Sequence, residues 1–371
     1  MSRSPISRRD WIKTAGVAAI GASLGARCAG RKGAAFKHAK VKVSPERVIR
    51  TVAGLRPFRG TGFRVETEKL DGKIVIHNYG HGGGGVTLSW GTSHLAMEEA
   101  VKTGESTCAV VGCGAVGLAT ARLLQRRGFD VAIYTRDLPP HTTSNVACAS
   151  WYPAEGVDPN KRTPEWTDQF IRAARLAYRY FQDLVGDYYG IRWYPSYTLS
   201  DEPLEEGGTG TVESTIQDLF PELADLEPRQ HPFGYRYCRR TWQMMIEPPV
   251  YLNAVLRDFR LAGGKVVRRE LADLGDLLSL PEPVILNCTG LGARELFNDE
   301  ELMPIKGQLT ILLPQPEIDY LFVAGGLYMM PRKDGVLLGG THERGEWSLE
   351  PNPAEAQRVM NGHIEFFEKM A

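Results

Sequence analysis

The sequence predicts an α/β protein in which a Rossmann-type nucleotide-binding domain is interleaved with an antiparallel sheet. Three observations lead to this fold class. A glycine fingerprint follows an apolar strand near residue 112, an apolar run ends in four consecutive glycines at 82–85, and strand-like runs joined by turns fill the chain from residue 303 onward. With 371 residues, the chain is long enough for one large domain or two interleaved domains.

The glycine fingerprint has the spacing G-x-G-x-x-G. An apolar strand at residues 108–111 precedes it and a helical pattern at 118–127 follows it. In this context the first glycine makes the turn, the second admits a pyrophosphate, and the third lets the helix pack on the strand. The motif predicts a dinucleotide site but leaves NAD and FAD both open. The positions offered to the pyrophosphate are Gly112, Gly114, Ala115, Val116 and Gly117.

The strand at residues 131–134 is expected to end near the adenosine ribose, where this fingerprint usually places an acidic residue. The nearest acid here is Asp137, while Thr135 and Arg136 lie closer to the strand end. Arg136 and Asp137 are therefore the candidates for this end of the cofactor.

Composition excludes several classes of partner. Lys and Arg together number 44, as do Asp and Glu, so no net field favours nucleic acid or an anionic membrane. A small neutral or zwitterionic substrate fits better. The 6 cysteines form no C-x-x-C pair, which indicates buried thiols and predicts neither a disulfide framework nor a metal site.

The first thirty residues resemble a twin-arginine export signal, because Arg8 and Arg9 precede the weakly apolar stretch Thr14–Ala26. That stretch is too short to span a bilayer stably. We therefore expect a signal at 1–30, a linker at 31–42, and a catalytic unit at 43–371. The expected partner is the twin-arginine machinery, with a periplasmic or exported location. A basic cytoplasmic N-terminal helix is the alternative.

The segment IVIHNYGHGGGGVTLSWG begins at Ile74 and carries the glycine run. Glycines remove every Cβ, so backbone amides can approach a flat or anionic ligand closely, and the helix that follows adds a positive dipole end. The wording H-N-Y-G-H-G-G-x-G resembles a signature of the D-amino-acid oxidase family of FAD enzymes. The resemblance implies that FAD contacts Gly82, Gly85, Val86 and Thr87, and that the Gly83 carbonyl accepts a hydrogen bond from the substrate amine.

Two further segments resemble the carboxylate site of that family. In G-L-R-P-x-R, Arg56 matches the carboxylate-binding arginine, whose planar fork suits two parallel hydrogen bonds. Tyr328 matches a tyrosine whose hydroxyl reaches the same carboxylate. An exposed strand arginine and a half-buried strand tyrosine are the structural alternatives. A second tyrosine of the family's lid is replaced here by Ala324.

The remaining family-like segments concern the flavin. The run T-T-x-x-V-A before W-x-P resembles the stretch along the cofactor, and N-C-T-G-L-G resembles a strand end near the pyrophosphate. A polar turn and a helix-capping turn are the alternatives. The residues implied are Thr142, Thr143, Ser144, Cys148, Ala149, Ser150, Thr289 and Gly290.

The order of these segments differs from the family's, because the last two, G-L-R-P-x-R and H-N-Y-G-H-G, stand at the front. The chain thus resembles a circularly permuted member, and we expect its C-terminal helix to lie beside the strand near Val48. The expected FAD-binding part covers 43–160 and 250–300, and the substrate part covers 161–249 and 301–371.

The resemblance implies oxidative deamination of D-amino acids by hydride transfer from the substrate Cα to flavin N5, with O2 as acceptor. His77 and His81 are then expected to be structural. Alternatives are a secondary-amine or glycine oxidase, a dehydrogenase with a membrane acceptor, and a catalytically silent flavin-binding protein. A nicotinamide enzyme fits least. A homodimer is compatible with the sequence.

Overall fold

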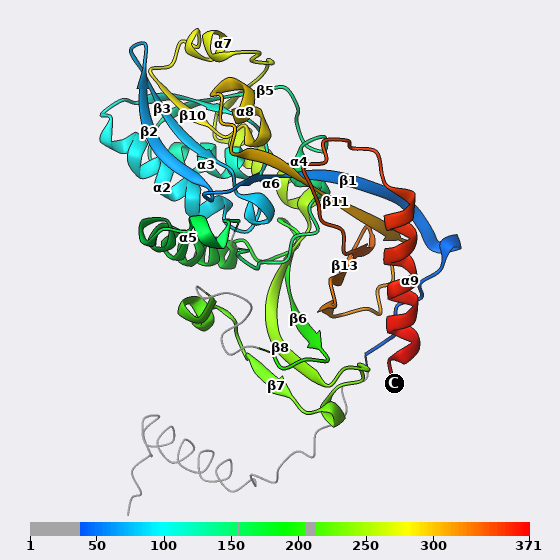
Figure 1. The fold of residues 1–371 in the computed structure, drawn as a ribbon. Coiled ribbons are helices and arrows are strands. Elements are labelled where there is room, and N and C mark those ends of the chain that lie inside the picture. The colour runs from blue at the N-terminus through cyan, green and yellow to red at the C-terminus, as the bar shows by residue number, and fades with distance from the viewer. Residues whose placement is uncertain (1–37, 155, 205–212) are drawn as a thin grey trace, which may run out of the picture. The chain divides into compact units, whose positions relative to one another are not determined.

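The computed structural model describes residues 38–154, 156–204 and 213–371. The predicted signal at 1–30 lies outside these ranges. The described chain forms two sheets with helices around them (Figure 1). Within it, none of the helices is both long and apolar enough to cross a membrane.

The six-stranded sheet carries the Rossmann unit. Its central strands β3, β10, β4 and β5 are parallel, and β2 adds an antiparallel edge. The strand TCAVV is buried on both faces, as parallel sheets require. In spatial order the strands are β2 Arg64–Leu70, β3 Lys73–Tyr79, β10 Val284–Asn287, β4 Thr107–Val111, β5 Asp130–Thr135 and β9 Lys265–Arg268.

Helices cover both faces of this sheet (Figure 1). On one face, α2 packs on α3 and α5, and α3 packs on α6. On the other face, leucines of α7 and α8 join Val75, Ala109 and Ile285 in a second apolar cluster. The helices are α2 Ser89–Lys102, α3 Ala115–Arg126, α5 Pro164–Asp183, α6 Pro248–Leu261, α7 Leu274–Leu278 and α8 Ala293–Leu296.

The nine-stranded sheet is mostly antiparallel and confirms the predicted second sheet. The expected hairpin around Lys333–Gly335 joins β13 to β14. A tighter turn joins β12 to β13, where Gly325 and Gly326 both have positive φ, as a type I′ turn demands. In spatial order the strands are β1 Val48–Arg59, β11 Leu302–Leu312, β14 Gly335–Gly339, β13 Leu327–Arg332, β12 Leu321–Ala324, β6 Ile191–Ser200, β8 Tyr237–Ile246 and β7 Ala224–Leu226, and β15 Glu343–Arg344 pairs with β11.

Two elements lie in a different part from the one expected. Strand β1 pairs along its whole length with β11 and so belongs to the nine-stranded sheet. Helix α5 packs on α2, beside the Rossmann unit. Both are amphipathic segments whose partner is set by tertiary packing, which local sequence does not reveal.

Short elements complete the chain. Helix α4, Thr143–Val146, contacts β1 and α6, and α9, Pro353–Lys369, packs on β11, β13 and β14. The 3-10 turns are η1 Pro45–Arg47, η2 Gly82–Gly84, η3 Pro159–Lys161, η4 Glu213–Leu219, η5 Pro228–Gln230 and η6 Gly290–Gly292.

The two ends of the described chain are neighbours. Val41 and Met370 belong to one apolar cluster, with Val48 packed against it. The Tyr320 hydroxyl donates to the Ala39 carbonyl at 3.0 Å and lies 3.8 Å from the Met370 sulfur. The expectation that the C-terminal helix lies beside the strand near Val48 is confirmed. Residues 38–42, assigned to a linker from sequence, lie on this cluster.

Candidate active site

Arg56 and Tyr328 meet on the face of the nine-stranded sheet opposite α9. The Arg56 guanidinium lies over Gly307 of β11, and the Tyr328 ring lies over Gly339 of β14, so closely that a Cβ at either glycine would overlap the side chain above it. Arg56 Nη1 also points at the Thr341 carbonyl, 3.5 Å away. The two strand glycines therefore form the floor on which the predicted carboxylate pair rests.

Tyr328 remains a neutral phenol at physiological pH. The pKa of its hydroxyl is raised to about 12, chiefly by burial and also by the nearby Cys148, although the charge of Arg56 and its hydrogen bond act in the opposite direction. An arginine only donates, so the phenol oxygen is the acceptor in this pair. The hydrogen of the phenol itself is then available to another acceptor.

Gly83 lies beside Arg56, as the sequence predicted. A Cβ at Gly83 would have only Arg56 Cδ within 4 Å, at 3.8 Å, so the loop is open on this side. Gly84 faces the other way, where a Cβ would come within 2.9 Å of the Ala154 carbonyl. The glycine run is thus held between Arg56 and the segment that follows the predicted flavin stretch.

Val86 and Thr87 lie between this loop and α2, just before the first helical residue, Ser89. The Thr87 hydroxyl contacts the carbonyls of Gly84 and Tyr152, each at 3.2 Å. Only three residues separate Gly85, the last glycine of the run, from the first residue of α2. Its N-terminus therefore follows the glycine run directly, and the dipole end lies at the loop.

The fingerprint loop fits a dinucleotide. Gly112 has φ 109, and a Cβ there would come 2.5 Å from the Cys288 carbonyl. Above Gly114 the nearest atom is the Ser144 hydroxyl, 3.1 Å from where a Cβ would be. The Ala115 amide, at the N-terminus of α3, donates to that same hydroxyl at 3.0 Å. This end of the helix offers amides and a dipole to a pyrophosphate.

Helix α4 brings further polar groups to the same place. Thr142 precedes its first residue, Thr143, and the Thr142 hydroxyl donates to Asn145 Oδ1 at 2.8 Å. The Asn145 amide nitrogen is buried without a protein partner. A buried donor of this kind needs an acceptor, which a phosphate or ribityl oxygen would supply. The residues of α4 and of the N-terminus of α3 therefore fit the diphosphate of FAD.

The stretch after α4 crosses to the nine-stranded sheet. Cys148 packs with Tyr328 in two adjoining apolar clusters, and burial raises the pKa of its thiol to about 12. Ala149 has φ 49, a left-handed backbone that costs energy for a residue with a side chain. Its carbonyl accepts from the Ile246 amide at 2.9 Å, and Ser150 forms a β-bridge with Met245. The predicted flavin stretch thus passes beside the carboxylate pair.

The residues predicted to lie near the adenosine follow the end of β5. Thr135 is its last residue, and its hydroxyl donates to the Asp137 carbonyl at 2.7 Å, which turns the chain back on itself. Arg136 Nε donates to Asp137 Oδ2 at 2.8 Å. The Tyr134 carbonyl accepts from the Gly112 amide at 2.8 Å, so both candidates lie next to the fingerprint loop.

The last predicted segment also lies against the fingerprint. A Cβ at Gly112 would stand 3.6 Å from the Thr289 amide nitrogen. The Thr289 amide and hydroxyl both donate to Asn287 Oδ1, which makes an Asx turn just before η6. Gly290 has φ 60 and faces Pro57, the residue after Arg56.

The two histidines predicted to be structural are buried. His81 Nε2 lies 2.9 Å from the Thr92 hydroxyl, and burial lowers its pKa to about 3. His77 Nε2 lies 3.0 Å from Glu68, and its Nδ1 lies 3.2 Å from the Asn287 amide. His81 therefore links the glycine loop to α2, and His77 links β3 to the neighbouring strands β2 and β10.

Sequence reasoning missed the residues that support the carboxylate pair. Gly307 and Gly339 had a usable signal, because a glycine inside a strand often marks a close approach. His342, whose pKa is lowered by burial and by Arg56 and Arg344, follows β14 beside the pair. His363 of α9 had no local signal, since its contact with β13 is long-range.

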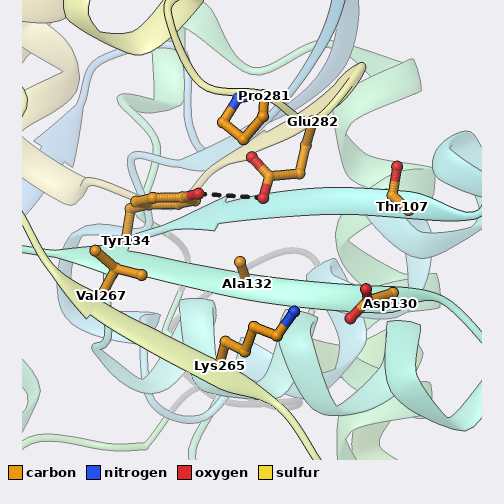
Figure 2. Close-up of a pocket in the computed structure, with 8 residues that line it drawn as sticks. All are labelled: Thr107, Asp130, Ala132, Tyr134, Lys265, Val267, Pro281 and Glu282. Atoms are coloured by element: carbon orange, nitrogen blue, oxygen red, sulfur yellow. Dashed lines mark hydrogen bonds between the residues drawn. The ribbon is translucent and has the colours of Figure 1, made fainter.

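A hollow of about 370 Å³ lies elsewhere on the six-stranded sheet (Figure 2). Thr107, Asp130 and Lys265 line it, and these residues begin β4, β5 and β9. Tyr134 donates to Glu282 at 3.1 Å across it. The fingerprint follows the opposite, carboxyl ends of β4 and β5, so this hollow is not part of the dinucleotide site.

Comparison with known proteins agrees with this geometry. The family model described as FAD dependent oxidoreductase matches residues 107–370. A D-amino-acid oxidase of Rubrobacter xylanophilus is 35% identical over 270 residues, which cover 68% of this chain and 74% of that relative. One from Streptomyces coelicolor is 31% identical over 68% and 74%. Human D-aspartate oxidase is 27% identical over 68% and 73%.

Solved structures share the fold. Glycine oxidase from Bacillus cereus superposes with a TM-score of 0.52 at 14% identity, over 70% of this chain and 77% of that one. L-proline dehydrogenase from P. horikoshii gives 0.52 at 16% identity, over 71% and 77%. Fold and site together define a flavin-dependent oxidoreductase. The chain belongs to the FAD-dependent oxidoreductase family, and FAD is its cofactor.

Proposed function

We propose that this protein oxidises D-amino acids to 2-oxo acids, ammonia and hydrogen peroxide. The observation that carries the proposal is the convergence of Arg56, Tyr328 and Gly83 beside the flavin stretch at Cys148. An arginine fork and a phenol suit a carboxylate, and the Gly83 carbonyl suits a protonated amine. The relatives named D-amino-acid oxidase support this substrate class.

Orientation is the contribution of the protein to this reaction. Arg56 and Tyr328 hold the substrate carboxylate, and Gly83 holds the amine. The Cα–H bond of the substrate can then point in one direction only. When bound, FAD would supply the acceptor for the hydride that leaves Cα and would pass the two electrons to oxygen, while the proton that the substrate ammonium loses and the proton from the hydride complete hydrogen peroxide. Water then hydrolyses the imino acid to the 2-oxo acid and ammonia. None of these steps needs a side-chain base at Cα.

A panel of matched D- and L-amino acids tests the proposal. For D-isomers we expect equal amounts of 2-oxo acid, ammonia and hydrogen peroxide, and no product from L-isomers. Products only from glycine or secondary amines would favour the alternative to which the glycine oxidase fold points. Flavin reduction without peroxide would indicate a dehydrogenase with another acceptor, and no reduction by any amine would indicate a silent flavoprotein.

We further propose that the chain is a circular permutant that is exported by the twin-arginine machinery. The adjacent ends support the permutation, and so does the start of the family match at residue 107, which omits the region of Arg56 and the glycine run. We assign the FAD-binding part to the six-stranded sheet with its helices and the substrate part to the nine-stranded sheet, so that β1 goes with the substrate part and α5 with the FAD-binding part. Arg8 and Arg9 support export, and fractionation of cells that carry Arg8→Lys and Arg9→Lys tests it.

A further inference from the structure

The outer face of the nine-stranded sheet is covered by α9, which packs on β11, β14 and β13 (Figure 1). Alternation along β13 places Tyr328 on the inner face and Met329 on the outer face, in the cluster with Val359 and Phe366 of α9. The helix thus lies directly behind the strands that hold the carboxylate pair.

Polar contacts tie α9 to these strands beside the glycine floor. At its start, the Asn352 amide donates to Gln308 Oε1 at 2.6 Å, and Gln308 follows Gly307. Six residues later, Arg358 Nη2 donates to the Gly340 carbonyl at 2.6 Å, and Gly340 follows Gly339. Gly307 and Gly339 lie beneath Arg56 and Tyr328, and the residue that follows each of them is therefore hydrogen-bonded to α9 or to its N-cap.

The third contact reaches Tyr328 itself. His363 is fully buried, and its Nε2 lies 3.2 Å from the Tyr328 carbonyl, while its Nδ1 lies 2.8 Å from the Val359 carbonyl. Next to it, a Cβ at Gly362 would come 2.7 Å from Leu327, so helix and strand are as close as a glycine allows. The imidazole fills the small space between them.

We propose that His363 is a positioning residue for substrate binding and that its neutral ring carries its one hydrogen on Nε2, from which it donates to the Tyr328 carbonyl and so fixes the phenol against the substrate carboxylate. The inference rests on the proposed function and assigns a task to α9 within it. The ring touches neither cofactor nor substrate. It acts through the backbone of β13, because the position of Tyr328 Cα sets where the phenol oxygen lies above Gly339.

A double-mutant cycle with carboxylate binding as readout tests this inference. The probe is a 2-oxo acid, the reaction product, titrated into the FAD-loaded enzyme while the flavin absorption band is followed. His363→Leu removes the donor, and we expect Kd to rise about threefold to tenfold, the loss of one ordinary hydrogen bond. In a Tyr328→Phe background the same change is expected to have less than about a twofold effect, since no phenol is left to position.

Two further variants separate positioning from folding. His363→Gln keeps a donor and is expected to restore most of the affinity. Phe367→Leu, in the same helix and packed on Phe322, is the matched control; it is expected to lower the unfolding midpoint and leave Kd unchanged. The inference about His363 would be overturned if Phe367→Leu raised Kd as much as His363→Leu does. It would also be overturned if His363→Leu raised Kd as much in the Tyr328→Phe background as in the wild type. Neither result would affect the proposed function. A wild-type flavin that responds to no 2-oxo acid and no D-amino acid would overturn the proposed function as well.

Discussion

At the scale of single residues, the proposed function depends first on the guanidinium of Arg56. Arg56→Lys keeps the charge but removes one of the two parallel hydrogen bonds. We expect kcat/KM to fall about tenfold to a hundredfold, since hydrogen bonds to charged groups contribute about 1.5–3 kcal/mol. The FAD dissociation constant should stay the same. Arg50→Lys, an exposed arginine on the same strand, is the control and should leave both quantities unchanged.

Tyr328 gives a prediction about alkaline pH. Its pKa is raised to about 12, above the usual value of 10.0, so folding favours the protonated phenol. The stability from this group is complete below pH 10 and is lost as pH rises from 10 to 12, by about 1.4 kcal/mol per pH unit. Tyr328→Phe should reduce that loss in denaturant titrations at pH 9 and pH 11. An identical loss in both proteins would contradict the assigned environment.

The sequence allowed the main residues of the site to be predicted, but not the residues that surround them. Arg56, Gly83 and Tyr328 followed from short motifs, and the structure places them together. The floor beneath them depends on strand register: Gly307 lies under Arg56 through the pairing of β11 with β1, and Gly339 lies under Tyr328 through the pairing of β14 with β13, which no local pattern encodes. Cross-sheet contacts of this kind join residues far apart in sequence and become visible only in the fold.

At the scale of elements, we expect α4 and α3 together to hold the pyrophosphate of FAD. Ser144→Ala removes the hydroxyl that accepts from the first amide of α3. We expect the apoprotein to lose about 1 kcal/mol of stability, the usual effect of losing a helix cap. The FAD dissociation constant should also rise about threefold to tenfold. Ser106→Ala, an exposed serine just before β4, should change neither quantity; equal effects from both variants would contradict this expectation.

The sequence predicted helices and strands correctly where a hydrophobic repeat or a turn glycine marks where they begin or end. It located the βαβ unit, the β13–β14 hairpin and the C-terminal helix. It did not reveal that β1 joins the nine-stranded sheet or that α5 lies on α2, because an amphipathic segment specifies a buried face and not its partner.

At the scale of the whole molecule, the adjacent ends allow the proposed permutation to be reversed. Joining Ala371 to His38 through a flexible linker and opening the chain at Gly104, an exposed residue between α2 and β4, restores the family's order of segments. We expect this chain to bind FAD and turn over D-amino acids within about threefold of the parent, because no buried contact is cut. Opening instead at Ala109, inside β4, should abolish FAD binding. A joined chain that fails when opened at Gly104 would contradict the permutation.

The most direct test of the central claim is anaerobic mixing of the FAD-loaded protein with a D-amino acid and with its Cα-deuterated form. We expect the flavin band to bleach with the D-isomer and not with the L-isomer, and deuterium to slow the bleaching several-fold. Bleaching by the L-isomer, or a band that no D-amino acid changes, would contradict the central claim.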